Sequence, residues 1–238
     1  MLPRRLRRQL WYMLQKEEVI MLRSAIFDLD GLLIDSETVA YHVDRDILRR
    51  YGHEFTLAHY AEKYSGRTIL RNMTDFIEEY ALPVTVEEGI RQYEEREAEY
   101  VRRGIPLKTG ARELLAWLKA QGCLISLASS SIEERARTIL EQNGVTDCFD
   151  FFTFGPEVKN GKPAPDIFLR ALEKTGAAAE DSLVLEDSDA GVRAAVAAGI
   201  PVACVPDVAR PGDGTLQMAT CVFDSLLQVM EWLKIRYI

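Results

Sequence analysis

The stretch Phe27-Asp28-Leu29-Asp30-Gly31-Leu32-Leu33-Ile34-Asp35-Ser36-Glu37 begins at the end of a short apolar run, residues 25–27. Such a run is typical of a buried strand. Side chains two residues apart on a strand point to the same side, so Asp28 and Asp30 are expected to leave the strand end together. Two carboxylates held this close are unfavourable unless a cation or a shared proton offsets their charge. The stretch therefore predicts a chemical site at the end of this strand.

The composition restricts the class of protein. The chain has 238 residues, which is enough for one large domain or for a core with a smaller companion. Its net charge of −8 disfavours a nucleic-acid partner, because no basic field of domain size is present. No apolar run approaches the roughly 20 residues that span a bilayer, so no membrane partner is expected. The four cysteines form no C-x-x-C pair, which favours reduced thiols and a cytoplasmic protein.

Strand and helix patterns alternate through most of the chain. Strands are predicted at residues 25–27, 123–128, 151–154, 182–185 and 202–205, with helices at 111–121, 132–142, 165–175, 188–198 and 226–235. This alternation predicts an α/β fold with a parallel, Rossmann-like sheet that is covered by helices on both faces. Ligands of such sheets bind beyond the carboxyl ends of the strands.

The region from residue 37 to residue 103 has no convincing strand. Helical patterns occupy residues 39–51, 57–64, 69–80 and 86–101, which predicts a helical insertion after the first strand. We interpret the many charges of the last pattern, Glu97 among them, as a solvated face. Residues 1–20 are rich in arginine and are expected to be a mis-assigned start or a dispensable extension; a basic interaction helix is the less favoured alternative.

Three further segments carry polar side chains at or near predicted strand ends. Ser129-Ser130-Ser131 ends the second strand and precedes a helix, where hydroxyl and free backbone N–H groups can hold an anion. Lys162 lies in a loop rich in glycine and proline, and Glu186-Asp187-Ser188 ends a later strand. Each segment alone is also compatible with helix capping or a solvated loop. Their order along the chain favours one joint site.

The predicted site has an excess of negative charge. It contains the carboxylates of Asp28, Asp30, Glu186 and Asp187 against the single ammonium of Lys162. A hard divalent cation such as Mg²⁺ is the natural ligand of this oxygen-rich set, and a phosphate group then becomes a favourable guest. One aspartate could attack phosphorus to form an aspartyl phosphate, while its neighbour protonates the leaving alkoxide and then activates water.

Taken together, these motifs resemble those of the haloacid dehalogenase superfamily, in the branch of β-phosphoglucomutase and small sugar-phosphate phosphatases. The resemblance covers residues 22–206 and is carried by residues 27–37, 127–131, 158–166 and 185–191. It implies a catalytic core of residues 21–36 and 106–238, with an inserted all-helical cap at 37–105 that excludes water and selects the substrate. It also implies a small phosphorylated metabolite as the substrate, and members of such families are often monomers.

The resemblance assigns roles to individual residues. It implies that Asp28 is the nucleophile and Asp30 the acid/base. It implies that Mg²⁺ is held by Asp28, Asp30 through its carbonyl, and Asp187, with Glu186 beside it. Phosphate would be held by Ser129, Ser130 and Lys162. In the cap, Arg67 is a candidate for substrate binding, although a surface position is about equally expected.

Three alternatives to a phosphatase follow from the same resemblance. A dehalogenase is disfavoured because Asp30 is present, and a carbon–halogen bond needs no proton donor. A β-phosphoglucomutase-type mutase is disfavoured because its motif residues, a histidine, a lysine and an arginine, are replaced here by Ala40, Ser65 and Ile69. A catalytically silent sugar-phosphate-binding regulator is the least favoured, since no motif residue is missing. We therefore expect a Mg²⁺-dependent phosphomonoester hydrolase.

Overall fold

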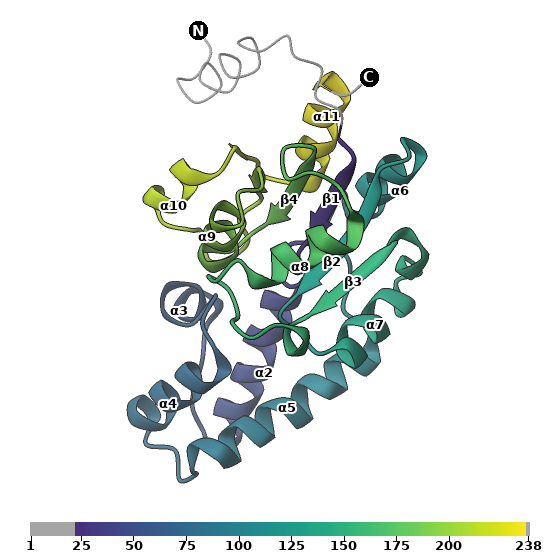
Figure 1. The fold of residues 1–238 in the computed structure, drawn as a ribbon. Coiled ribbons are helices and arrows are strands. Elements are labelled where there is room, and N and C mark those ends of the chain that lie inside the picture. Colours follow the sequence, from purple (N-terminus) through teal and green to yellow (C-terminus); the bar gives the residue numbers. More distant parts are fainter. Residues whose placement is uncertain (1–21, 237–238) are drawn as a thin grey trace, which may run out of the picture.

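A computed structural model describes residues 22–236 and contains a six-stranded sheet between layers of helices (Figure 1). All paired strands run parallel, in the order β3-β2-β1-β4-β5-β6. The strands are β1 (Ser24–Phe27), β2 (Leu124–Ser129), β3 (Phe151–Phe154), β4 (Ser182–Glu186), β5 (Val202–Cys204) and β6 (Cys221–Val222). The predicted α/β class with a parallel, Rossmann-like sheet is confirmed.

The central strand β1 is fully buried because helices cover both faces of the sheet. Its side chains alternate: Ile26 packs into one apolar cluster, and Ala25 and Phe27 pack into the other. The helices α8 (Asp166–Thr175) and α9 (Asp189–Ala197) contribute to the cluster of Ile26. The opposite cluster contains side chains of α6 (Ala111–Ala120), α7 (Glu133–Gln142) and α11 (Leu226–Arg236). This two-sided burial explains why the strands read as continuous apolar runs.

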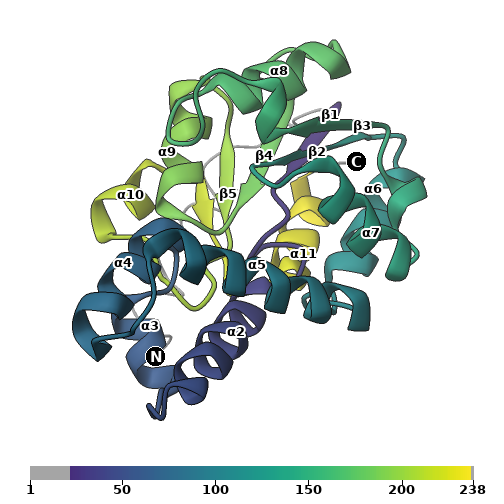
Figure 2. The ribbon, with the colours of Figure 1, turned by 90° about the horizontal axis from the view of Figure 1, so that it is seen from below.

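Four helices form the insertion between β1 and α6. They are α2 (Ser36–Arg50), α3 (Leu57–Lys63), α4 (Ile69–Tyr80) and α5 (Val86–Arg103), and residues 36–103 include no strand. Figures 1 and 2 show this group together on one side of the sheet, next to α7. Phe55 packs at its centre, in contact with the rings of Tyr64 and Phe76. The predicted helical insertion is thus present, whereas the exact domain limits at 37 and 105 stay a prediction.

Two short elements were not expected from the sequence. These are α10 (Asp213–Met218) and β6, which has only two residues and lies at the edge of the sheet. Elements this short carry too few residues for a periodic pattern. The expectation for residues 1–20 falls outside the described part of the chain. No helix within residues 22–236 is long and apolar enough to cross a membrane.

Candidate active site

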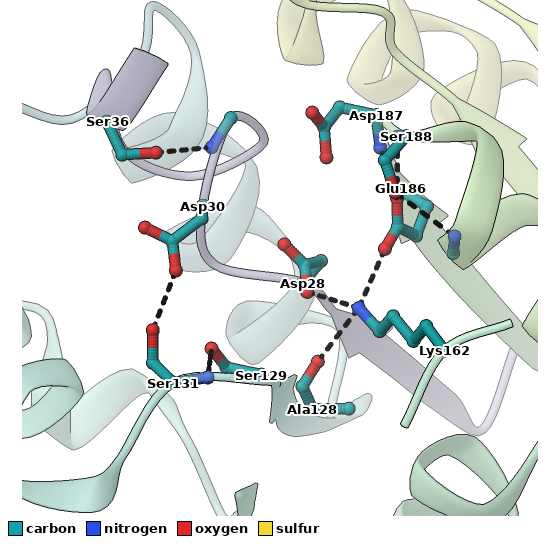
Figure 3. Close-up of polar contacts among 12 residues, drawn as sticks. Asp28, Asp30, Ser36, Ala128, Ser129, Ser131, Lys162, Glu186, Asp187 and Ser188 are labelled. Atoms are coloured by element: carbon teal, nitrogen blue, oxygen red, sulfur yellow. Dashed lines mark hydrogen bonds and ion pairs between the residues drawn. The ribbon is translucent and has the colours of Figure 1, made fainter. Parts of the chain in front are cut away.

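The register of the sheet brings three predicted segments to one edge. Phe27 of β1 is level with Leu127 of β2 and with Leu185 of β4. Asp28, the next residue, donates its backbone N–H to the Leu185 carbonyl at 3.1 Å, so the ladder continues one step beyond β1. The side chain of Asp28 therefore emerges beside Glu186. The predicted meeting of these segments at the carboxyl ends of the strands is what the structure contains (Figure 3).

Lys162 links two of these carboxylates. Its Nζ forms ion pairs with Asp28 Oδ1 and with Glu186 Oε1, the latter at 2.7 Å. Only 8% of the Lys162 side chain is exposed, and its ammonium also lies over the ring of Phe168. The loop that carries Lys162 leads directly into α8, and α8 packs against β1 and β2. A buried ammonium shared by two carboxylates balances part of their charge.

Glu186 and Asp187 occupy the junction between β4 and α9. Glu186 Oε2 accepts hydrogen bonds from the backbone N–H groups of Asp187 and Ser188 and from the Ser188 hydroxyl, at 2.7–2.9 Å. The Asp187 carboxyl differs, because its Oδ1 is buried and has no hydrogen-bond partner among the described residues. A Cβ on Gly31 would approach Asp187 Oδ2 to 2.2 Å, so the glycine keeps space free at that carboxyl.

Two of the buried carboxyl groups, those of Asp28 and Asp187, resist ionisation. Burial raises the pKa of Asp28 to about 7, against the opposing charge of Lys162. Burial, with the charge of Glu186 as the next cause, also raises the pKa of Asp187 well above its usual range. Oxygen atoms of Asp28, Glu186 and Asp187 lie within 4.8 Å of one another. This oxygen-rich donor set, with an orphaned oxygen on Asp187, fits a hard divalent cation.

Asp30 lies on the other side of the loop, away from Lys162 (Figure 3). Both of its carboxylate oxygens accept hydrogen bonds from the guanidinium of Arg135, at 3.1 and 2.9 Å. The hydroxyl of Ser131 donates to the same carboxylate at 2.8 Å. Arg135 also pairs with Glu97 of α5 at 3.1 Å. One arginine of the core thus holds Asp30 and reaches the helical insertion.

Arg135 was not predicted as a site residue from the sequence, and the predicted environment of Glu97 was wrong. Ser131 lies just before α7 and Arg135 lies in its first turn, so their short separation in the sequence was the available signal that the two side chains could meet. Glu97 was expected on a solvated face, but its ion pair with Arg135 contradicts that interpretation. The helix α5 packs against α7, and no pattern within either helix alone shows which charges meet across the contact.

The serines and Arg67 have local partners. Ser129 is buried and its hydroxyl accepts the backbone N–H of Ser131 at 3.1 Å, whereas Ser130 is exposed toward a cleft. Arg67 donates to Asp75 at 2.6 Å and to the Lys63 carbonyl, and it lies over the ring of Tyr64. Its Nε is buried without a partner among the described residues. Binding roles for these three residues stay predictions.

A cleft of about 1180 Å³ separates the helical insertion from the core. Asp30, Ser130, Ser131 and Arg135 line it on the core side, and residues of α2, α4 and α5 line it on the other. Asp30 therefore stands between the carboxylate cluster and the cleft. The lining includes Asp30 but neither Asp28 nor Lys162, so Asp30 is the member of the aspartate pair that a small molecule in the cleft would contact.

The fold and the carboxylate cluster define a Rossmann-like core with a buried acidic site at the carboxyl ends of its strands. Residues 25–205 match the profile of the haloacid dehalogenase-like hydrolases, which covers well over half of the 238 residues. The chain belongs to this family, and the resemblance drawn from the motifs is confirmed.

Several related proteins of this family are phosphatases. A probable pseudouridine-5'-phosphatase from Drosophila melanogaster is 36% identical, over 76% of this chain and 80% of that protein. The phosphorylated carbohydrates phosphatase of Thermotoga maritima is 30% identical, over 75% and 82%. A bifunctional riboflavin kinase/FMN phosphatase from Arabidopsis thaliana is 33% identical over 78% of this chain, but the match spans 48% of that longer protein. The chain is an enzyme of the phosphatase type within this family.

The fold also matches solved structures. The crystal structure of a candidate beta-phosphoglucomutase from Thermotoga maritima superposes with a TM-score of 0.77 and 28% identity, over 89% of this chain and 98% of the other. The likeness includes nearly the whole length of that protein. It supports the arrangement of sheet and helices described above.

Lys162→Met should destabilise the metal-free protein strongly at pH 8 and less at pH 5. Without the ammonium, Asp28 and Glu186 are left unpaired in a buried position, which typically costs about 3–5 kcal/mol. The native pKa of Asp28, about 7, exceeds the value of about 3.9 in an unfolded chain. Asp28 is therefore protonated at pH 5 and needs no cation there, but it ionises above pH 7. Urea unfolding at both pH values measures the difference.

Lys119→Met is the matched control, because Lys119 pairs with Asp150 at the surface. A loss for Lys162→Met that is equal at both pH values, or no larger than that of the control, would contradict the role of Lys162 as the cation of a buried cluster.

Proposed function

We propose that the protein hydrolyses phosphate monoesters of small metabolites, sugar phosphates in particular, with Mg²⁺ as the cofactor and Asp28 as the nucleophile. The observation that carries this proposal is the environment of Asp28. Asp28 is 6% exposed, and its carboxyl is paired with Lys162. It lies beside Glu186 and Asp187 at the carboxyl ends of the strands. Phosphatases with 30% or more identity support the same reaction type.

The residues present fit a bound Mg²⁺. Asp28, Asp187 and the backbone carbonyl of Asp30 would hold the ion, with Glu186 beside them, because the orphaned Oδ1 of Asp187 needs a partner. When bound, the ion lowers the repulsion between an attacking carboxylate and a phosphate dianion. Lys162 would add a second positive charge on the phosphate, together with the hydroxyl and backbone groups of Ser129 and Ser130.

The proposed reaction has two steps. In the first, an oxygen of Asp28 forms a bond to phosphorus as the ester P–O bond breaks, and Asp30 gives its proton to the leaving alkoxide. In the second, Asp30 takes a proton from water, whose oxygen attacks phosphorus and releases Asp28. Asp30 needs freedom to turn from Arg135 toward the substrate for both proton transfers. Helices 36–103 would act as the cap that excludes bulk water.

Hydrolysis is favoured over a mutase reaction, in which a second phosphate must be held by the cap. Ser65 and Ile69 stand where the mutases carry cationic side chains, and Ser65 donates its hydroxyl to Glu37. The guanidinium of Arg67 is already bound by Asp75. A silent regulator is disfavoured because the nucleophile and acid/base positions are both aspartates. We further propose a monomeric, cytoplasmic enzyme, for which the net charge of −8 and the scattered cysteines are the support.

Asp28→Asn should lower turnover by at least about a thousandfold and leave the fold intact, because an amide is not a nucleophile toward phosphorus. Phosphate release from p-nitrophenyl phosphate, with Mg²⁺ and with EDTA, measures the loss. Acid-quenched wild-type protein should carry one phosphoryl group on the peptide that contains Asp28. Asp181→Asn, at the other end of β4, is the control and should change nothing. Retained turnover in Asp28→Asn would refute the assignment of the nucleophile.

Arg135→Gln should slow hydrolysis of an alkyl phosphate about tenfold more than that of p-nitrophenyl phosphate. Arg135 contacts both oxygens of Asp30, and only the alkoxide leaving group needs the proton of Asp30 to depart. Glu97→Gln, which keeps the contacts of Asp30, should affect both substrates alike. Steady-state kcat and KM for the two substrates provide the test. An equal loss on both substrates in Arg135→Gln would show that Arg135 does not act through Asp30.

A further inference from the structure

The wall of the cleft formed by the helical insertion contains polar groups without partners. Asp44 of α2, Asn72 of α4 and Tyr93 of α5 all line the cleft and are more than nine-tenths buried. Neither the Asp44 carboxyl nor the Tyr93 hydroxyl forms a hydrogen bond or an ion pair with another residue of the described chain. Asn72 donates its Nδ2 to the Tyr64 carbonyl, but its Oδ1 is buried without a partner.

Such groups are unfavourable in a folded protein. A buried polar group without a hydrogen bond costs folding free energy, so most are satisfied in native structures. Burial raises the pKa of Asp44 well above its usual range, and the charge of Glu37 adds to this effect. Burial thereby favours the neutral form of the Asp44 carboxyl, and a neutral carboxyl can both donate and accept a hydrogen bond. Three such residues on three helices around one cleft indicate a ligand that completes their hydrogen bonds.

The charges of the cleft restrict the nature of that ligand. Glu37 and Glu97 line the same wall as Asp44, so a second phosphate or a carboxylate there would meet like charges. Three arginines line the cleft, and two of them are already engaged, Arg135 by Asp30 and Glu97, and Arg67 by Asp75. The third, Arg102, is exposed and is outnumbered by the glutamates of the same lining, which are Glu37, Glu94, Glu97 and Glu134. The wall therefore offers neutral donors and anionic acceptors, a combination that suits hydroxyl groups, because each hydroxyl donates and accepts at once.

We infer that Asp44, Asn72 and Tyr93 form a subsite for the hydroxyl groups of the leaving group. The substrate class is the monophosphate of a polyol or sugar whose far end carries hydroxyls and no second acidic group. This inference rests on the proposed phosphatase function. In the complex, a substrate hydroxyl accepts from the Asp44 carboxyl or the Tyr93 phenol and donates to Glu37 or to Asn72 Oδ1. The subsite lies across the cleft from the core groups Asp30 and Ser130.

The test uses substrates that share a carbon chain but differ in hydroxyls. Phosphate release from sorbitol 6-phosphate, n-hexyl phosphate and 6-phosphogluconate is measured with the full chain and Mg²⁺. The expected kcat/KM for sorbitol 6-phosphate exceeds that for n-hexyl phosphate at least tenfold, because the alkyl chain leaves the buried polar groups unpaired. 6-Phosphogluconate, which carries a carboxylate at its far end, is expected to be a poor substrate.

Two variants test whether the substrate preference arises from Asp44 and Tyr93. Asp44→Leu and Tyr93→Phe should each reduce the preference for sorbitol 6-phosphate over n-hexyl phosphate about tenfold, with each rate normalised to the same variant's hydrolysis of p-nitrophenyl phosphate. Asp44→Leu should also raise the melting temperature, since it removes an unpartnered buried carboxyl. Gain of stability with loss of selectivity is the signature of a binding group, and a purely structural residue does not give it.

Asp46→Asn is the matched control on the same helix. Asp46 is held by Arg96 and Tyr100, and these contacts lower its pKa to about 2 despite its partial burial. Its substitution should lower the melting temperature and leave the substrate preference unchanged. Asp44 and Asp46 are two residues apart, so a difference between the two variants reflects their contacts rather than a general weakening of α2.

Several outcomes would overturn the inference. These are equal activity of the wild type on sorbitol 6-phosphate and n-hexyl phosphate, a preference for 6-phosphogluconate, and an unchanged preference in both Asp44→Leu and Tyr93→Phe. If Asp44→Leu fails to fold, Tyr93→Phe, which removes one hydroxyl, decides alone. Failure of the proposed function has a different result, namely no Mg²⁺-dependent phosphate release even from p-nitrophenyl phosphate.

Discussion

The arrangement of the core depends on one electrostatic constraint. Three carboxyl groups are buried together, and a single ammonium group balances part of their charge. Asp28, Glu186 and Asp187 lie at the ends of two neighbouring strands, and Lys162 pairs with the first two. If all four ionised, the cluster would carry two uncompensated negative charges in a region with little water. Burial therefore raises the pKa of Asp28 and Asp187. A buried cluster with this excess of carboxyl groups is a favourable environment for a divalent cation, because a cation offsets the charge that burial makes costly.

The parallel sheet that places these carboxyl groups at one edge could be predicted from the sequence. Parallel strands covered on both faces appear as apolar runs, and the polar motifs begin where those runs end, at Asp28, Ser129 and Glu186. Because all strands are parallel, every motif after a strand lies on the same edge. The sequence did not reveal that β4 lies directly beside β1, which sets Asp28 against Glu186. Strand order is decided by how the helices pack.

The cleft was much less predictable, for a physical reason. Periodicity shows that α5 is a helix, but the same pattern of charges fits a solvated face and a face that meets another helix. Glu97 was assigned to solvent and instead pairs with Arg135. Asp44 lies in the same helix as Asp46, and Asp46 is held by an arginine. Only packing between helices distinguishes the two aspartates, since neither local sequence nor residue type differs enough to do so.

The two sides of the cleft differ in whether their polar side chains have hydrogen-bond partners within the protein. In the core, the carboxylates of Asp28, Asp30 and Glu186 each have a close donor, so these groups are held in place before a substrate arrives. In the helical insertion, Asp44 and Tyr93 are buried with their polar groups unused. No residue of the described chain completes their hydrogen bonds, so a bound compound whose hydroxyls do so is selected over one that lacks them. Arg135, which contacts Asp30 and Glu97 together, is the side chain through which the chemistry of the core and the position of the insertion can influence each other.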